Sequence, residues 1–529
     1  MCHCGMLLAM WVFAAGSLAM ANDTEPTVSR VIHPRWAPRS IVLRDDDVTP
    51  IMGYRAQLTG HLSHQPMPDP DVLSSKCTVF GFVDAADAMV FRVEAPCDGA
   101  YTIAVLCNAR RELLEGLTLE VVHDGTSLTA QPPHAQTPQG SSRLTYERVR
   151  MPGLLKLHQG ANEIVVRLRE RSDAQAKLAA KELSRRIHAM RDGSFRVWSI
   201  ELARPEALEQ IRRRAESLRA STQWMIDGKY GLFTHWSPLC YPLHGDVQTK
   251  DCYQEAVEAF DVDAYVNMVE ETGAAWVVFT TTHGPHYWPG PCKTIDRILP
   301  GRTCRRDLIG ELADALGRKG IRLMLYYHTG YGDKPWAEAS GMYKEDLGEY
   351  FDNLAALFEE VSKRYGRRLA SSAVYIDTSP RTLYQLDCPY ERITRAIKSG
   401  NPDAIVGYST DYLPMLTAFA DIPSQDGYDW ADAPLPEEWF GPGCAYDELQ
   451  RSRFLFMDDW IPRKPLNGVF PPPHHAPEQY VHFIEKMAEQ KAPVTINLLI
   501  TQDVKRGQPF VNPECLAIMR QVRRAIRGE

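Results

Sequence analysis

The feature that most constrains the fold is an alternation of strand-like and helix-like segments from Trp224 onward. Parallel strands need a crossover, usually a helix, so repeated units of this kind predict a (β/α)8-like TIM barrel over residues 224–529. No glycine-rich dinucleotide turn is present, which favours a barrel over an open nucleotide-binding sheet. The clearest predicted strands are 231–236, 274–281, 321–327 and 373–378, and the clearest helices are 262–272, 305–319 and 345–365.

One of these predicted strands ends on a carboxylate. Residues 373–378 read Ala-Val-Tyr-Ile-Asp-Thr, an apolar strand followed by a polar turn. Side chains at the carboxyl ends of barrel strands point into a common mouth, where Asp377 could act as a nucleophile. The alternative is a structural role for Asp377, as a helix cap or in a turn.

Imidazole and aromatic side chains stand at three other predicted strand ends. The first strand ends at His235 and Trp236, the second runs into His283, and the third ends at Tyr326-Tyr327-His328. Aromatic faces and fixed polar groups are what a sugar ring requires of its binding site. These strand ends together predict a carbohydrate site, although any single histidine could instead be a buried barrel residue.

The region before the barrel has a different pattern. Residues 77–203 contain short segments rich in β-branched residues, separated by Gly and Pro turns, which predicts an antiparallel β-sandwich. The chain is therefore expected to be multidomain. Its other predicted parts are a polar leader at 22–76 with one or two edge strands, a helical insertion at 174–190 and a linker helix at 204–223.

Two turns of the predicted sandwich carry a resemblance of their own. Residues 98–101 read Asp-Gly-Ala-Tyr, and residues 157–162 read Leu-His-Gln-Gly-Ala-Asn. These turns resemble those of galactose-binding-like sandwiches, which are common as carbohydrate-binding modules. The resemblance implies either sugar binding by this part of the chain or a role as a packing partner only.

The N-terminus resembles a targeting segment. Residues 6–20 are mostly apolar, and Ala19-Met20-Ala21 has the small-x-small form of a signal-peptide cleavage site. We therefore expect residues 1–21 to be a signal peptide and the protein to be secreted or periplasmic. No other apolar run is long enough to span a membrane. A net charge of −8 without a basic block argues against nucleic acid or an anionic membrane as a partner.

Cysteine spacing leaves two alternatives open. Ten of the 12 cysteines lie beyond the predicted signal peptide, a number that an oxidising compartment could pair. Cys240 with Cys252 and Cys292 with Cys304 are the local candidate pairs, and free buried cysteines are the alternative. No Cys/His cluster has the spacing of a structural zinc site, so no metal is predicted.

Ordered blocks in the second half resemble the α-L-fucosidases and related retaining glycoside hydrolases. Residues 230–236 read Tyr-Gly-Leu-Phe-Thr-His-Trp, similar to the family's Phe-Gly-x-Phe-x-His-Trp opening. Blocks at 260–280, 306–312, 320–327 and 497–500 follow in the family's order. The resemblance covers roughly residues 224–526 and implies a barrel fold and a two-step retaining mechanism that needs two carboxylates and no cofactor.

The resemblance also implies roles for individual residues. Asp377 would be the nucleophile, with Tyr375 where relatives carry Trp. One of Tyr326 or Tyr327 would contact the sugar, and we take Tyr327 as the predicted contact. The other predicted substrate contacts are His235, Trp236, His283, His286 and Tyr375.

The chain departs from the family pattern at two segments. Residues 282–287 read Thr-His-Gly-Pro-His-Tyr where relatives have Lys-His-His-Asp-Gly-Phe, and residues 409–411 read Ser-Thr-Asp where relatives have Asn-Asp-Arg. Losing such ring contacts should change which sugar is bound, because each unpaired group costs roughly 1 kcal/mol or more.

The acid/base residue is not fixed by alignment. Asp426 is nearest by spacing, Glu438 is its rival, and Asp429 and Glu437 lie in the same loop. The sequence thus predicts a secreted exo-acting glycoside hydrolase that cleaves a terminal deoxy or neutral sugar from a glycan. The alternative is a catalytically inactive carbohydrate-binding protein on the same scaffold.

Overall fold

The computed structural model describes twelve stretches of the chain. These are residues 37–64, 78–82, 86–109, 117–131, 146–170, 195–237, 239–246, 248–410, 413–424, 449–450, 452–504 and 511–529. The predicted signal peptide and the predicted helix at 174–190 lie outside them. Among these residues, none of the helices has both the length and the apolar character needed to cross a bilayer.

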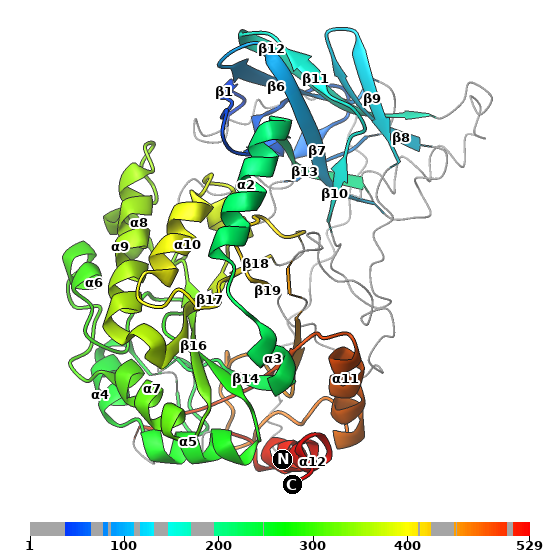
Figure 1. Cartoon of the computed structure of the whole chain (residues 1–529). Helices are drawn as coiled ribbons and strands as arrows, with labels where there is room; N and C mark the ends of the chain where they lie inside the picture. The colour runs from blue at the N-terminus through cyan, green and yellow to red at the C-terminus, as the bar shows by residue number, and fades with distance from the viewer. Residues whose placement is uncertain are drawn as a thin grey trace, which may run out of the picture.

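The N-terminal part consists of two β-sheets, seen at one end of the molecule in Figure 1. One sheet has the order β1 (Ile41–Val42), β6 (Ala88–Ala95), β12 (Gly160–Glu170), β8 (Leu117–His123), β9 (Thr126–Ala130), with β3 (Gln57–Leu58) also on β6. The other has the order β10 (Glu147–Arg150), β7 (Gly99–Ala109), β13 (Phe195–Ala203), β5 (Val79–Phe80), β4 (Ser63–His64), with β11 (Leu155–Leu157) on β7 and β2 (Thr49–Met52) on β13.

The two sheets share one apolar core. Alternate residues of β6, such as Phe91 and Val93, are fully buried, whereas Arg92 between them is exposed. Val105 of β7 and Val197 of β13 bring the second sheet to the same core, as expected for two sheets packed face to face. All pairs are antiparallel except β1 with β6. The stretch 22–76, expected as a leader with one or two edge strands, contributes β1 to β4.

The second part is a sheet of eight parallel strands in sequential order. Its strands are β14 (Tyr230–Thr234), β15 (Trp276–Thr280), β16 (Arg322–His328), β17 (Leu369–Asp377), β18 (Gly407–Ser409), β19 (Ile422–Ser424), β20 (Arg453–Phe456) and β21 (Val494–Leu498). The last strand, β21, pairs with the first, β14, so the sheet curls into a barrel. Among the described residues β19 and β20 are not paired, so the barrel is nearly closed.

Helices cover this barrel, and the predicted helices at 262–272, 305–319 and 345–365 correspond to α5, α7 and α9. They are α4 (Tyr253–Glu258), α5 (Val262–Glu271), α6 (Lys293–Ile298), α7 (Leu308–Arg318), α8 (Lys334–Ser340), α9 (Gly348–Tyr365), α10 (Tyr390–Lys398), α11 (Pro477–Glu489) and α12 (Pro513–Arg527). Three begin at an aspartate whose carboxylate accepts a backbone N–H of the first turn: Asp261, Asp307 and Asp333. α3 (Gln223–Gly228) leads into β14.

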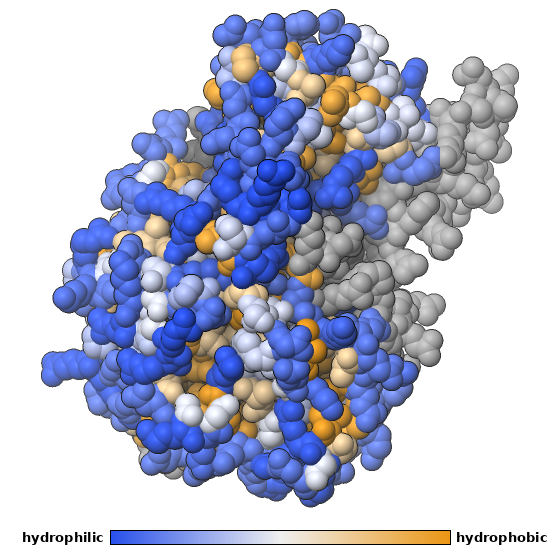
Figure 2. Space-filling model, viewed as in Figure 1, coloured by the Kyte–Doolittle hydropathy of each residue, from blue (hydrophilic) through white to orange (hydrophobic). Residues whose placement is uncertain are grey.

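One barrel helix is replaced by the helix that leaves the N-terminal sheets. No helix is present among the described residues between β18 and β19. Instead α2 (Pro205–Leu218) runs down the barrel side (Figure 1) and buries Ile211 and Ala215 against Phe419 of that connection. The outward side of α2 is hydrophilic in Figure 2, consistent with an amphipathic helix.

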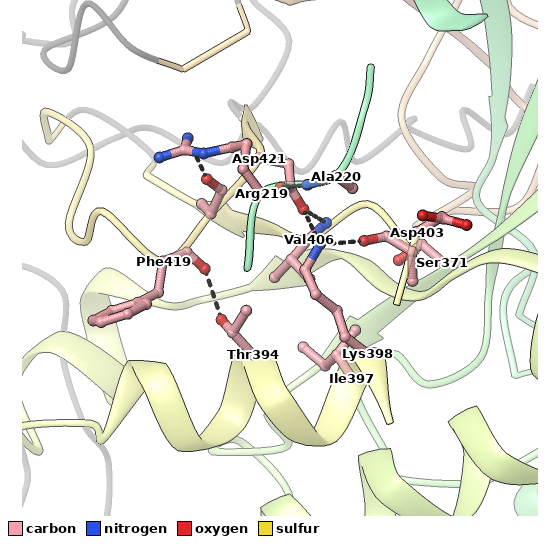
Figure 3. A network of polar contacts seen from close by, with 12 residues as sticks. Arg219, Ala220, Ser371, Thr394, Ile397, Lys398, Asp403, Val406, Phe419 and Asp421 are labelled. Atoms are coloured by element: carbon pink, nitrogen blue, oxygen red, sulfur yellow. Dashed lines mark hydrogen bonds and ion pairs between the residues drawn. The ribbon is translucent and has the colours of Figure 1, made fainter. Parts of the chain in front are cut away.

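A buried ion pair fixes the end of this linker to the barrel (Figure 3). Lys398 Nζ of α10 donates to Asp421 Oδ2 at 2.8 Å, and both side chains are almost fully buried. Asp421 also accepts the backbone N–H groups of Ala220 and Val406, each at 2.8 Å. Arg219, next to Ala220, donates to the carbonyl of Ala420. The chain that enters the barrel is thus held by the residues that begin β18 and β19.

We predict that Asp421→Asn lowers the free energy of unfolding by about 3–5 kcal/mol, because it leaves the buried Lys398 ammonium unpaired. The control is Glu163→Gln, which breaks the exposed pair with Arg92 and should cost less than about 1 kcal/mol. Denaturant unfolding of the full chain measures both changes. Equal losses in the two variants would contradict the role given to the buried pair.

Candidate active site

The barrel interior is filled by aromatic side chains from alternate strand positions. Phe233 of β14 lies with its ring centroid 5.4 Å from Tyr326 of β16 and 5.5 Å from Tyr375 of β17. Tyr375, predicted to contact substrate, also lines a small apolar cavity of about 30 Å³ inside the barrel together with Phe233. Because side chains two residues apart share a face, the next inward positions toward the mouth are His235, His328 and Asp377.

Asp377 is the last residue of β17 and lies at the carboxyl end of the barrel, as predicted. Tyr326 donates its hydroxyl proton to Asp377 Oδ2 at 2.5 Å, and the Thr378 N–H donates to Oδ1 at 2.6 Å. Thr378 has φ of +62°, a conformation that side-chain-bearing residues seldom adopt. The chain therefore turns sharply after the carboxylate, and both carboxylate oxygens are held in place.

Two histidines lie beside this carboxylate and its tyrosine. The ring of His235 is 4.4 Å from that of His283 and 4.7 Å from that of Tyr326, centroid to centroid. His235 is completely buried, and neither of its ring nitrogens has a hydrogen-bond partner among the described residues. An unpaired polar group in the interior is costly, which makes this ring a candidate contact for a polar ligand.

Burial also sets the charge of these two rings. It lowers the pKa of His235 well below its ordinary value, and His283, His328 and Arg463 lower it further. Burial lowers the pKa of His283 in the same way, with smaller contributions from His328 and Arg463. Both rings are therefore neutral near pH 7, and each offers one donor and one acceptor.

Two further rings, those of Trp460 and His328, complete the cluster and were not among the predicted catalytic residues or substrate contacts. Trp460 follows β20 and lies with its ring centroid 4.5 Å from that of His235. Asn497 holds the Trp460 turn by donating to the carbonyls of Asp459 and Trp460. The ring of His328 is 5.4 Å from that of His283. Trp460 was missed because it follows β20, and the strand order after Thr410 is not clear in the sequence.

Comparison with known proteins fits this geometry. Residues 249–406, which include His283, Tyr326 and Asp377, match the family model described as Alpha-L-fucosidase. By this match the segment is similar to the alpha-L-fucosidase family. The matched segment contains β15 to β17, whose ends carry the carboxylate and one of the two histidines.

Individual relatives are distant. The chain resembles the tissue alpha-L-fucosidase of Bos taurus, at 26% identity over 20% of this chain and 28% of the relative. It also resembles that of Macaca fascicularis, at 26% identity over 23% of this chain and 34% of the relative. The chain thus spans about a third or less of these curated relatives. Among solved structures, alpha-L-fucosidase isoenzyme 1 from Paenibacillus thiaminolyticus aligns over 59% of this chain and 76% of its own, at 16% identity and a TM-score of 0.42.

Three of the predicted substrate contacts, Trp236, His286 and Tyr327, do not face Asp377. Trp236 stacks on Phe279 in the layer between barrel and helices, and its ring N–H donates to Gln502 Oε1 at 2.9 Å. Its surroundings belong to the outer apolar core, so we assign Trp236 to packing instead of substrate binding.

His286 and Tyr327 lie in the same outer layer. His286 stacks on Trp336 with centroids 3.6 Å apart, and its Nε2 lies 3.0 Å from the Tyr327 hydroxyl. Tyr327 packs on Phe358 of α9. Neighbouring residues of a strand point to opposite faces, so Tyr326 points inward and Tyr327 outward. The placement corrects the prediction: Tyr326, not Tyr327, reaches the carboxylate.

The remaining predictions concern the acid/base residue, the cysteine pairs and metal binding. The candidate acid/base residues Asp426 and Glu438, with Asp429 and Glu437, lie outside the described residues. The eight described cysteines are all free, so the pairs Cys240–Cys252 and Cys292–Cys304 are not formed. Within the described part of the chain, no group of three or more His, Cys, Asp or Glu side chains could hold a metal ion.

Because burial lowers the pKa of His235 well below its ordinary value, we predict that this ring stays neutral as the pH falls through about 6.5, where free histidine side chains titrate. Carbon-13 labelling of histidine Cε1 and an NMR pH titration measure this, with the resonance assigned by its loss in His235→Asn. A His235 resonance that titrates with the exposed rings would contradict the burial described above.

Proposed function

We propose that this chain is a retaining exo-glycoside hydrolase in which Asp377 is the nucleophile. The observation that carries the proposal is the cluster at the barrel mouth. It combines a carboxylate fixed by Tyr326 with a buried histidine whose ring nitrogens have no described partner. The fucosidase-family match of the segment that contains Asp377 supports the same reaction.

Each side chain has a distinct task in this proposal. The Asp377 carboxylate attacks the anomeric carbon and forms a covalent glycosyl intermediate, while an acid protonates the leaving oxygen. The same acid then acts as base and activates the water that releases the sugar. In retaining enzymes the two carboxyl groups are about 5–5.5 Å apart, so Asp426 or Glu438 would have to reach that distance from Asp377.

The substrate we propose is a terminal neutral or deoxy sugar of a glycan. The His235 and His283 rings are neutral and would exchange hydrogen bonds with sugar hydroxyls, and the Trp460 ring beside them offers an apolar face. Two contact segments of the family are altered at 282–287 and 409–411, so we do not limit the proposal to fucose. Export of the protein and sugar binding by the N-terminal sheets remain predictions.

We predict that the purified chain releases nitrophenol from at least one member of a panel of nitrophenyl glycosides that includes the α-L-fucoside. Asp377→Asn should lower kcat by about a thousandfold or more, because the nucleophile is lost. The matched control is Asp352→Asn, an exposed carboxylate on α9, which should leave kcat and KM unchanged.

Two outcomes would overturn the proposal. One is a wild-type chain that binds sugars of the panel but hydrolyses none of them, which would favour an inactive carbohydrate-binding protein. The other is an Asp377→Asn variant that is as active as the wild type. For an active enzyme, NMR of the first-formed sugar should show retention of anomeric configuration, as the double displacement requires.

A further inference from the structure

A buried polar cluster joins the N-terminal sheets to the barrel segment that follows Asp377. Arg148 of β10 makes two hydrogen bonds to Glu201 of β13, at 2.6 and 3.1 Å, and both side chains are less than 10% exposed. The Tyr384 hydroxyl lies 2.7 Å from Ser199 Oγ and donates to Glu201 Oε1 at 3.1 Å. Tyr384 thus links this cluster to the barrel segment that follows Asp377.

The segment between Asp377 and Tyr384 is short and hydrogen-bonded throughout. It contains a single π-helical turn, Pro380–Tyr384, whose last N–H donates to the Ser379 carbonyl at 2.8 Å. Thr382 donates both its N–H and its hydroxyl to the Thr378 carbonyl, at 3.0 and 2.8 Å. Thr378 in turn donates its N–H to Asp377 Oδ1. A displacement of Tyr384 would therefore be passed on to the carboxylate.

The turn at Thr378 needs such support. A residue other than glycine at φ of +62° is strained, and strained turns persist only when the surrounding structure holds them. The hydroxyl of Thr329 from the neighbouring β16 connection contacts both Thr378 and Thr382 on one side. Tyr384 with Glu201 and Ser199 holds the other end of the segment.

We infer that Tyr384, anchored by Ser199 and Glu201 of the N-terminal sheets, is a positioning residue for Asp377. The sheets thus act as part of the active-site scaffold through this contact. The catalytic consequence rests on the proposed function, whereas the mechanical link between the two parts does not. Arg148 also donates to the Met415 carbonyl at 2.8 Å, so the same cluster holds the connection between β18 and β19.

The charge of the cluster explains why it can hold a segment firmly. A buried glutamate carboxylate needs an opposite charge beside it, and the Arg148 guanidinium provides this charge through a bidentate ion pair. Glu201 is thereby held as an acceptor for the Tyr384 hydroxyl, which lies 3.1 Å from its Oε1. An apolar contact at this place would tolerate sliding, whereas a hydrogen bond to a fixed carboxylate specifies one register.

The test compares two tyrosines of the same neighbourhood. Tyr384→Phe removes the hydroxyl that reaches Ser199 and Glu201, whereas Tyr390→Phe removes a buried hydroxyl with no partner among the described residues. Hydrogen–deuterium exchange of residues 378–386 and the kinetics of glycoside hydrolysis are measured for both. We expect Tyr384→Phe to speed exchange of this segment about tenfold. It should also lower kcat about tenfold with KM within about twofold, while Tyr390→Phe changes neither.

Two results for Tyr384→Phe would overturn the positioning role of Tyr384. Unchanged exchange of residues 378–386 in Tyr384→Phe overturns it, even if that variant has a lower melting temperature. Faster exchange with unchanged kcat also overturns it, because the link would then not position the carboxylate. If the wild type hydrolyses no glycoside, the proposed function fails, and the exchange measurement still decides the link. Should Tyr384→Phe not fold, Ser199→Ala removes one of the two contacts and is expected to speed exchange of the same residues less strongly.

Discussion

The alternation of side chains along parallel strands is the constraint on which the site depends. It directs Phe233 of β14, Tyr326 of β16 and Asp377 of β17 into the barrel, together with His235, which directly follows β14. The aromatic rings form a packed floor beneath the polar mouth. The intervening residues face the helices instead, as Tyr327 does. A shift of one residue in any of these strands would exchange the two sets and remove the site.

The polar groups of the mouth differ in how many hydrogen-bond partners they have. Asp377 has partners for both carboxylate oxygens, so its position is defined without a ligand. His235 is buried without a described partner, and burial keeps its ring neutral. Such an arrangement costs folding free energy that an apolar residue would not cost, and the glycan substrate that we propose would recover part of this cost by hydrogen bonding.

The N-terminal sheets and the barrel are tied together at several points. Helix α2 occupies the barrel side where the chain between β18 and β19 forms no described helix, and the buried Lys398–Asp421 pair fixes the end of that linker. The Arg148–Glu201–Tyr384 cluster adds a second tie close to the carboxylate. Loops set the geometry of sites on barrels, so a neighbouring unit that holds such a loop helps to shape the candidate site.

The sequence by itself determined three features: the strand–helix order up to about Thr410, the presence of short strands in the N-terminal region, and the strand-end position of Asp377. It could do so because periodicity and turn residues are local properties. It also pointed to His235 and His283. It could not decide between Tyr326 and Tyr327, place Trp236 and His286 in the outer layer, or find Trp460. Those outcomes depend on which face of a strand meets the helices and on which distant turns meet at the mouth. Only tertiary packing fixes such contacts, since they join residues far apart along the chain.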